Sequence, residues 1–242
     1  MVATYSICIT HYNDVNTLEP SLESILNQID SRFEVIVVDQ NSTDGSKSIL
    51  ERYDHMGKIR LFHQSVRNRG LGREFAYEKS VGKYIISQMD MDDFFLPGLQ
   101  GLVSLYHASY EGKVLRVRRS PVEGHEYFCG VTVSPRKVVE RIGGWRGVNW
   151  FEDSDFWYRA SNANLLAEVK FPIMVRNRAN YEHRSFFARA KHRYLVFKEL
   201  IRTGLPWDQV DTRIDWQNFL IYVTAWIGAR LDPLPTKQPT GA

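Results

Sequence analysis

The regular alternation of strand-like and helix-like segments in the N-terminal half constrains the fold of this chain most strongly. Residues 33–39 read FEVIVVD, a nearly continuous apolar run that is typical of a parallel sheet covered on both faces. The strand-like runs span residues 5–10, 33–39, 59–64 and 83–90, and the segments with apolar residues at helical spacing span 18–29, 41–53 and 70–82. This alternation predicts an α/β fold with a mostly parallel sheet flanked by helices.

The pattern is less regular after Pro97. We expect a helix that begins at Pro135, because proline suits the first helical position, and that ends at the following glycines. The other expected elements are strands at 125–134 and 165–175 and helices at 151–163, 186–204 and 212–231. No repeat or clear linker interrupts the 242 residues, so a single domain is expected.

Composition narrows the class of protein. A hydrophobic content of 43% and a charged content of 24% are typical of a globular chain, and a net charge of +3 does not by itself indicate nucleic acid. Cys8 and Cys129 lie in apolar, strand-like runs, so buried thiols are expected and a disulfide is not. The N-terminus reads as a strand and not as a signal peptide, and no apolar run reaches the roughly 18 residues that span a bilayer. We therefore expect a soluble, cytoplasmic protein.

Three aspartates lie at the end of the fourth strand-like run and just after it, within the sequence ISQMDMDDFFLPG, residues 86–98. Asp90, Asp92 and Asp93 would repel one another unless a solvated turn or a positive partner relieves them. Ligands of open α/β sheets bind at the carboxyl ends of the strands, where this cluster is expected. Neither a phosphate-binding P-loop nor a dinucleotide fingerprint is present. A D-x-D pair on such a turn is suited to Mg²⁺ or Mn²⁺ that also binds a diphosphate.

Four ordered blocks of the sequence resemble the family 2 glycosyltransferases of GT-A fold, inverting enzymes that use a nucleotide-diphosphate sugar. The blocks lie between Tyr5 and Arg159 and read SICITHYNDVNTLEPSLESILNQ, FEVIVVDQNSTDGSKSIL, NRGLGREFAYEKSVGKYIISQMDMDDFFLPG and IGGWRGVNWFEDSDFWYRA. The resemblance implies a GT-A type, Rossmann-like sheet with C-terminal helices. It divides the chain into a nucleotide-sugar-binding half (1–98), an acceptor and catalytic half (99–184), and C-terminal helices with a tail (185–242).

The resemblance also implies a donor site. Thr10 and Tyr12 would line the nucleobase pocket, Tyr12 by stacking, and Asp39 would accept a hydrogen bond from the base, most naturally from N3–H of uracil. Arg73 would lie near the nucleotide, although an ordinary ion pair, for instance with Asp39, is its alternative role, and Asp90 would contact the ribose.

The metal and catalytic residues are implied in the same way. Asp92 would bind Mn²⁺ or Mg²⁺ on the diphosphate, and His183 would complete that site. Asp153 would be the base that deprotonates the acceptor hydroxyl, with Glu152 as the alternative. Trp145 and Trp150 would stack on sugar faces, unless they pack in the core. Asp93, Asp44 and Asp155 have structural alternatives as helix caps or loop anchors.

The expected partners are a nucleotide-sugar donor, most naturally a UDP-sugar, and a glycan or lipid-linked acceptor. The family's processive synthases carry a Q-x-x-R-W element and membrane spans, which this sequence lacks, so transfer of one sugar is favoured. Residues 176–198 are basic with interleaved aromatics and could bind single-stranded nucleic acid or anionic lipid, or form a solvated face. The apolar segment 216–231 could pack on the domain, on a second subunit as a homodimer, or at the inner face of a membrane.

Two other classes of function remain open from the sequence. A module with this fold could bind nucleotide-sugars without turnover, and a nucleic-acid-binding protein could use the basic C-terminal segment. The Asp153 carboxylate argues against the first alternative, and the weak net charge gives no support to the second, so we expect no nucleic-acid partner.

Overall fold

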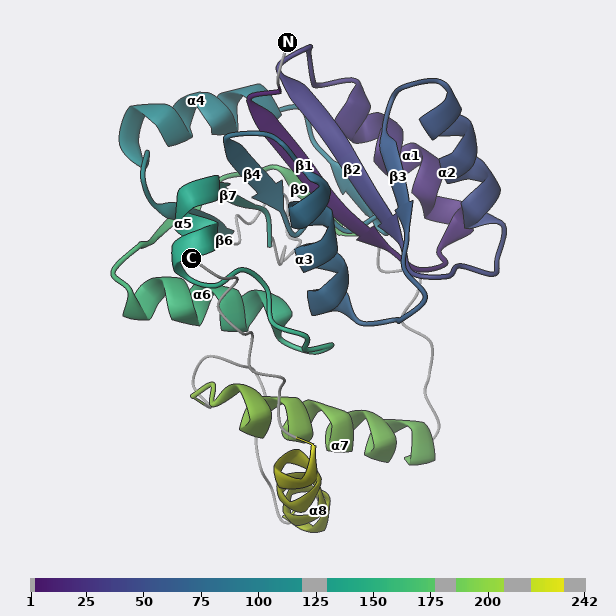
Figure 1. Ribbon diagram of the computed structural model, residues 1–242, viewed down its shortest axis with the longest axis vertical. Helices are drawn as coiled ribbons and strands as arrows, with labels where there is room; N and C mark the ends of the chain where they lie inside the picture. Colours follow the sequence, from purple (N-terminus) through teal and green to yellow (C-terminus); the bar gives the residue numbers. More distant parts are fainter. Residues whose placement is uncertain (1–2, 119–129, 177–185, 207–218, 233–242) are drawn as a thin grey trace.

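The computed structural model describes residues 3–118, 130–176, 186–206 and 219–232 (Figure 1). Seven strands of this described part form one sheet in the order β3-β2-β1-β4-β7-β6-β8, and two short strands form a second sheet, β5-β9. The strands are β1 (Tyr5–His11), β2 (Phe33–Asp39), β3 (Arg60–His63), β4 (Tyr84–Ser87), β5 (Asp93–Phe95), β6 (Val114–Arg118), β7 (Thr132–Pro135), β8 (Leu166–Lys170) and β9 (Met174–Arg176).

Helices cover both faces of the large sheet, as the apolar strands require. The helices are α1 (Val15–Leu26), α2 (Ser46–His55), α3 (Arg69–Lys79), α4 (Leu99–Ser109), α5 (Arg136–Arg141), α6 (Glu152–Asn162), α7 (Phe186–Thr203) and α8 (Phe219–Leu231). Side chains of α1, α2 and α4 share one hydrophobic core with Ile7, Ile9 and Val35, whereas α3, α5 and α6 share the other with Cys8 and Ile36. The two-residue period of β1 and β2 thus divides their side chains between two cores.

The predicted mostly parallel α/β sheet is confirmed, with one reversal. The pairs β1·β2, β2·β3, β1·β4 and β6·β8 are parallel, and β7 is antiparallel to both β4 and β6. In the parallel part His11 pairs with Asp39 and Asp39 pairs with His63, so the first three strands end at the same level. This common end places the loops that follow β1, β2 and β4 beside one another.

One expectation for the middle of the chain was wrong, and two elements were not predicted. The expected single strand at 165–175 is two strands in different sheets, because Pro172 lacks the N–H that a ladder requires and interrupts the run between β8 and β9. The sequence pattern also missed α4 and β6. Asp93 begins β5, which pairs with β9. This position agrees with the structural role, a loop anchor, that was the alternative for Asp93. The described part of the expected strand at 125–134 forms the start of β7.

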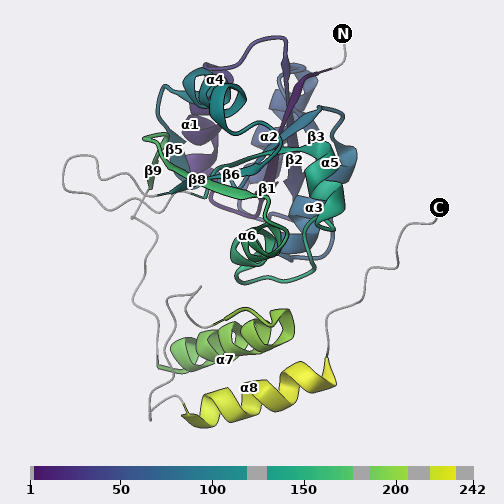
Figure 2. The same ribbon diagram turned by 90° about the vertical axis from the view of Figure 1, so that its left-hand side faces the viewer.

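The C-terminal helices α7 and α8 pack against each other at one end of the molecule and run in the same chain direction (Figure 2), since Tyr194 lies beside Gly228 and Lys198 pairs with Asp232. Val196, Phe197 and Leu200 of α7 form a third core with Ala225 of α8. Trp150, Phe151 and Tyr158 pack against this core and connect it to the α/β domain. Within the described residues, no helix is both long and apolar enough to cross a membrane.

Candidate active site

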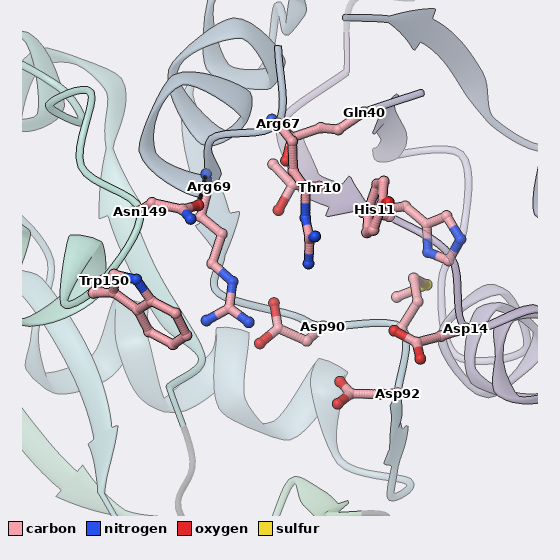
Figure 3. A pocket seen from close by; sticks show the side chains of 12 residues that line it. Thr10, His11, Asp14, Gln40, Arg67, Arg69, Asp90, Asp92, Asn149 and Trp150 are labelled. Carbon is pink, nitrogen blue, oxygen red and sulfur yellow. Dashed lines mark hydrogen bonds between the residues drawn. The ribbon is translucent and has the colours of Figure 1, made fainter. Parts of the chain in front are cut away.

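A pocket lies at the carboxyl ends of β1, β2 and β4 (Figure 3). It contains five of the predicted residues, Thr10, Tyr12, Asp90, Asp92 and Trp150. The remaining lining residues are His11, Asp14, Gln40, Arg67, Arg69, Met91 and Asn149. The chain therefore brings both carboxylates and guanidinium groups into one polar pocket, and segments up to about 140 positions apart contribute to it.

One wall of the pocket depends on a close approach between the start of α3 and the loop before α6. The Gly70 N–H donates to the Val148 carbonyl at 2.9 Å, and the Arg69 N–H donates to Asn149 Oδ1 at 3.0 Å. A Cβ atom at Gly70 would lie 1.9 Å from the Arg146 carbonyl oxygen, so only glycine fits there. This contact holds the cationic residues Arg67 and Arg69 opposite Asp90.

The two arginines were not predicted as site residues, and they supply the positive charge of the pocket. Figure 3 shows the guanidinium groups of Arg67 and Arg69 pointing into the pocket that also contains Asp90. The Arg67 guanidinium lies 3.8 Å from the centre of the Tyr12 ring, so one face of that ring is already covered. The sequence signal was available, because Arg67 and Arg69 follow the third strand directly, at the rim where ligands bind.

Asp39 is buried behind the pocket, with an exposed fraction of 1%. Its Oδ2 accepts a hydrogen bond from the Ser42 N–H at 3.2 Å and lies 3.6 Å from His63 Nδ1. Its Oδ1 accepts no hydrogen bond from any residue that the structure describes. Because an unsatisfied buried carboxylate oxygen is costly, a donor from a bound ligand would stabilise this position.

His11 is the buried neighbour of Asp39 at the end of β1. Burial lowers the pKa of His11, against the opposing effect of Asp39, Asp14 and Asp44, so the imidazole is neutral near pH 7. Its Nε2 has no hydrogen-bond partner among the described residues, which again leaves a polar atom available at the pocket.

Arg73 connects the pocket to the start of α6. Its guanidinium is 2% exposed and lies 3.3 Å from Asp90, 3.1 Å from Glu152 and 3.1 Å from Asp153. Burial alone would lower the pKa of Arg73, but these three carboxylates raise it well above its usual value. Arg73 therefore forms ion pairs, but with Asp90, Glu152 and Asp153 and not with the Asp39 that was one expected partner, and these contacts link Asp90 with both candidate bases.

Asp153 and Glu152 occupy the first turn of α6, where the helix dipole favours carboxylates. Glu152 is 4% exposed, whereas the Asp153 side chain is 26% exposed and can therefore be reached from outside. Burial, with further repulsion from Glu152 and Asp90, raises the pKa of Asp153, and Arg73 opposes this shift. The geometry favours Asp153 over Glu152 as a proton acceptor. Asp155, by contrast, pairs with Arg146 and Arg159 and has a structural role.

The metal site was predicted at Asp92, which lines the pocket and is half-buried. Among the described residues, no three histidine, cysteine or acidic side chains are grouped closely enough to hold an ion by themselves. A site with Asp92 as its carboxylate fits a hard divalent cation that takes one or two carboxylates from the protein and its other ligands from a diphosphate. His183, the other predicted ligand, lies outside the described residues.

The two tryptophans predicted to contact sugars have different positions. Trp145 is 1% exposed and stacks on Phe156 with ring centres 4.4 Å apart, so it packs in the core and does not reach the pocket. The expectation that Trp145 stacks on a sugar is therefore wrong, because the Gly144–Trp145 backbone folds against buried Glu74. Trp150 does line the pocket, 5.5 Å from the Arg69 guanidinium.

With this geometry established, the comparisons with known proteins identify the family. The model of glycosyl transferase family 2 matches residues 6–161, and the chain belongs to that family. The putative glycosyltransferase EpsE of Bacillus subtilis is 33% identical over 233 residues, with 83% of each chain covered. An uncharacterized glycosyltransferase of Rickettsia bellii is 36% identical over 93 residues, which are 38% of this chain and 13% of that protein. The resemblance seen in the sequence is confirmed.

Solved structures confirm the GT-A fold. Residues 1–349 of TarS from S. aureus superpose with a TM-score of 0.64 at 14% identity, over 93% of this chain and 80% of that one. A mannosyltransferase from Pyrobaculum calidifontis, solved with GDP-Man and Mn²⁺, superposes with a TM-score of 0.62 at 15% identity, over 96% and 70% of the two chains.

Proposed function

We propose that this protein is an inverting, divalent-metal-dependent glycosyltransferase that transfers one sugar from a nucleotide-diphosphate sugar to an acceptor hydroxyl. The observation that carries the proposal is the pocket in which Asp90 and Asp92 lie with Arg67 and Arg69 at the ends of β1, β2 and β4. A diphosphate needs cationic groups, and a metal bound to it needs carboxylates, and this pocket holds both.

The donor's base is assigned to the part of the pocket formed by β1 and β2. Thr10 and Tyr12 line it, and the unsatisfied Oδ1 of Asp39 is suited to accept the N3–H of uracil, which favours a UDP-sugar. Because Arg67 covers one face of Tyr12, the base would stack on the other face or displace Arg67. TarS has been solved with UDP and with UDP-GlcNAc, which supports this class of donor.

The ribose and diphosphate are assigned to the rim after β4. Asp90 would accept hydrogen bonds from the ribose hydroxyls, and Asp92 would hold Mn²⁺ or Mg²⁺. The bound cation would act as a Lewis acid that stabilises the charge of the departing diphosphate. Arg67 and Arg69 would add hydrogen bonds and positive charge to the same group.

Transfer requires a base beside the anomeric carbon. As the acceptor oxygen attacks that carbon, Asp153 would take its proton, while the bond to the diphosphate breaks and inversion follows. Arg73 would hold Asp153 and Asp90 at a defined separation, because it contacts both carboxylates. The acceptor is proposed to be a glycan or a lipid-linked molecule.

Thermal unfolding with UDP-, GDP- and dTDP-sugars, each with and without Mn²⁺, tests the proposal. We expect the largest rise in melting temperature with a UDP-sugar plus Mn²⁺. Asp92→Asn should remove the metal-dependent part of the rise, and Asp39→Ala should reduce the rise with UDP, while Glu51→Gln on the exposed surface of α2 serves as the control. No stabilisation by any nucleotide-sugar would refute the donor site.

A non-catalytic binding module would give the same thermal shifts, so turnover needs its own assay. Donor hydrolysis or transfer, followed as release of UDP, should occur with the wild type and be lost in Asp153→Asn, which keeps its thermal shift. Binding without UDP release by the wild type, across a range of acceptors, would favour the non-catalytic alternative.

A further inference from the structure

Several large apolar side chains of α8 face outward, whereas an ordinary amphipathic helix directs such side chains toward the core. Small residues face α7: Ala225 and Ala229 are buried, and a Cβ atom at Gly228 would lie 2.4 Å from the Tyr194 hydroxyl of α7. Small residues of this kind let two helix backbones approach closely. The helix therefore packs on α7 through these small residues together with Ile221 and Tyr222, and it leaves other large apolar side chains on the opposite side.

The outward side of α8 carries an apolar stripe. Leu220, Val223, Ile227 and Leu231 follow one another at intervals of three or four residues and thus share one face of the helix. Leu220 is 76% exposed, Ile227 is 49% exposed and Leu231 is 81% exposed. Trp226 flanks the stripe, and the Arg230 guanidinium lies 3.6 Å from the centre of its ring. Large apolar groups in such a row mark an interaction surface.

The neighbouring charge indicates what this surface contacts. The sequence of α7 contains five basic residues, Arg189, Lys191, Arg193, Lys198 and Arg202, and one acidic residue, Glu199. Lys198 pairs with Asp232 and Arg202 with Glu199, which leaves the N-terminal part of α7 as the more basic part. Lys191 and Arg193 are exposed, and α7 lies directly beside α8. A symmetric dimer through the apolar stripe would bring two such basic helices toward each other, which is unfavourable. An anionic lipid surface would attract the same charges.

We propose that the outward face of α8 lies in the headgroup region of an anionic membrane, with the helix parallel to the surface. A tryptophan next to an arginine at the edge of an apolar stripe is the composition expected at that depth. Figures 1 and 2 show α8 as the outermost element, beyond α7 and away from the sheet.

Membrane contact at α8 would also orient the pocket. The carboxyl ends of β1, β2 and β3 point toward the end of the molecule that carries α7 and α8 (Figure 1). Trp150 lines the pocket and also packs against the α7–α8 core, and Arg146 donates a hydrogen bond to the Thr203 carbonyl at 3.0 Å. The pocket end of the sheet would therefore face the lipid surface.

Co-sedimentation with vesicles tests the inference and requires neither donor nor acceptor, so its result is independent of the proposed transfer. We expect the full chain to bind phosphatidylcholine vesicles that contain about 30% phosphatidylglycerol, and to bind pure phosphatidylcholine at least tenfold more weakly. The double variant Leu220→Gln/Ile227→Gln should lower binding at least tenfold. Val81→Gln, which replaces an exposed valine far from α8, should bind like the wild type.

Two further measurements test the contribution of the basic residues and the alternative that a second copy of the chain is the partner. Lys191→Gln/Arg193→Gln should reduce binding and flatten its dependence on salt, with circular dichroism showing that each variant is folded. Failure of the wild type to bind the anionic vesicles, or equal binding by the Leu220/Ile227 variant, would overturn the proposal. A dimer in sedimentation that the same double variant dissociates, without vesicle binding, would assign the face to a second copy and would also overturn it.

Discussion

Replacing Arg73 by methionine should destabilise the protein strongly, and the loss should depend on pH. The guanidinium is 2% exposed and lies 3.1 Å from Glu152 Oε1 and 3.1 Å from Asp153 Oδ1. At such distances each attraction is worth about 5 kcal/mol when the effective dielectric constant is about 20, before the cost of desolvation. Methionine keeps much of the side-chain volume and removes the charge.

The expected loss follows from the carboxylates that remain. Glu152 is 4% exposed, and Asp153 already has a raised pKa with Arg73 present. Removing one partner from a buried ion pair costs about 3–5 kcal/mol, because the other charge stays buried without compensation. We expect a decrease of this size in the unfolding free energy near pH 8.

The direction of the pH dependence is determined by the same carboxylates. Without Arg73 the pKa of Asp153 in the folded state rises further above its unfolded value of about 4, so the folded state binds this proton more tightly. Stability is then greatest at low pH and decreases as the pH rises through this interval. The difference between the variant and the wild type should therefore shrink by about 1–3 kcal/mol between about pH 8 and about pH 5.

Urea unfolding followed by circular dichroism at both pH values measures these differences. Arg52→Met is the matched control, because Arg52 pairs with Glu19 at 2.6 Å while the two side chains are 53% and 45% exposed. An exposed pair contributes about 0–1 kcal/mol. A loss below about 1 kcal/mol in Arg73→Met, or a loss that does not vary with pH, would refute the charge-balancing role of Arg73.

Three further predictions test the site and the core. The pKa of Asp153 is raised to about 8, and a base must be deprotonated, so kcat/KM for transfer should increase with pH up to that value. Asp153→Asn should lower kcat by about 10²–10⁴ without changing nucleotide affinity. A flat pH profile would contradict this role. Gly144→Ala should lower the unfolding free energy by about 2–4 kcal/mol, because φ is +61° and the new Cβ would lie 2.2 Å from Glu74 Oε2. The control Gly57→Ala, at φ +68° with no described atom within 4 Å, should lower it by about 1 kcal/mol, as measured by urea unfolding. Burial raises the pKa of Cys8 to about 12, which makes this thiol unreactive in the folded protein. In a Cys129→Ser variant, iodoacetamide should therefore label Cys8 only after denaturation. Rapid labelling of the folded protein would show that β1 is accessible.

The sequence was sufficient for the parts of the fold that depend on local pattern. The apolar runs of β1, β2 and β4 and the helical periods of α1 to α3 were predicted, because a strand buried on both faces needs continuous apolar residues and its covering helices need one apolar side. The prediction from pattern failed at α4, although its buried Leu99, Leu102, Val103 and Tyr106 follow helical spacing. It failed again at Pro172, where one apolar run serves two sheets.

The sequence alone identified the family through four ordered blocks, and it named Asp90, Asp92 and Thr10 as rim residues, since strand ends are readable from the chain. The tertiary structure alone decided which charges meet. Arg73 contacts Asp90, Glu152 and Asp153, and Trp145 lies in the core, although nothing in their local sequence distinguishes these outcomes. Arg67 and Arg69 follow the third strand, which places them near the rim, but only the structure shows that they enter the pocket. The physical reason is that an ion pair or a buried ring depends on the distance between segments far apart in the chain, and packing of α3 against the loop before α6 determines that distance.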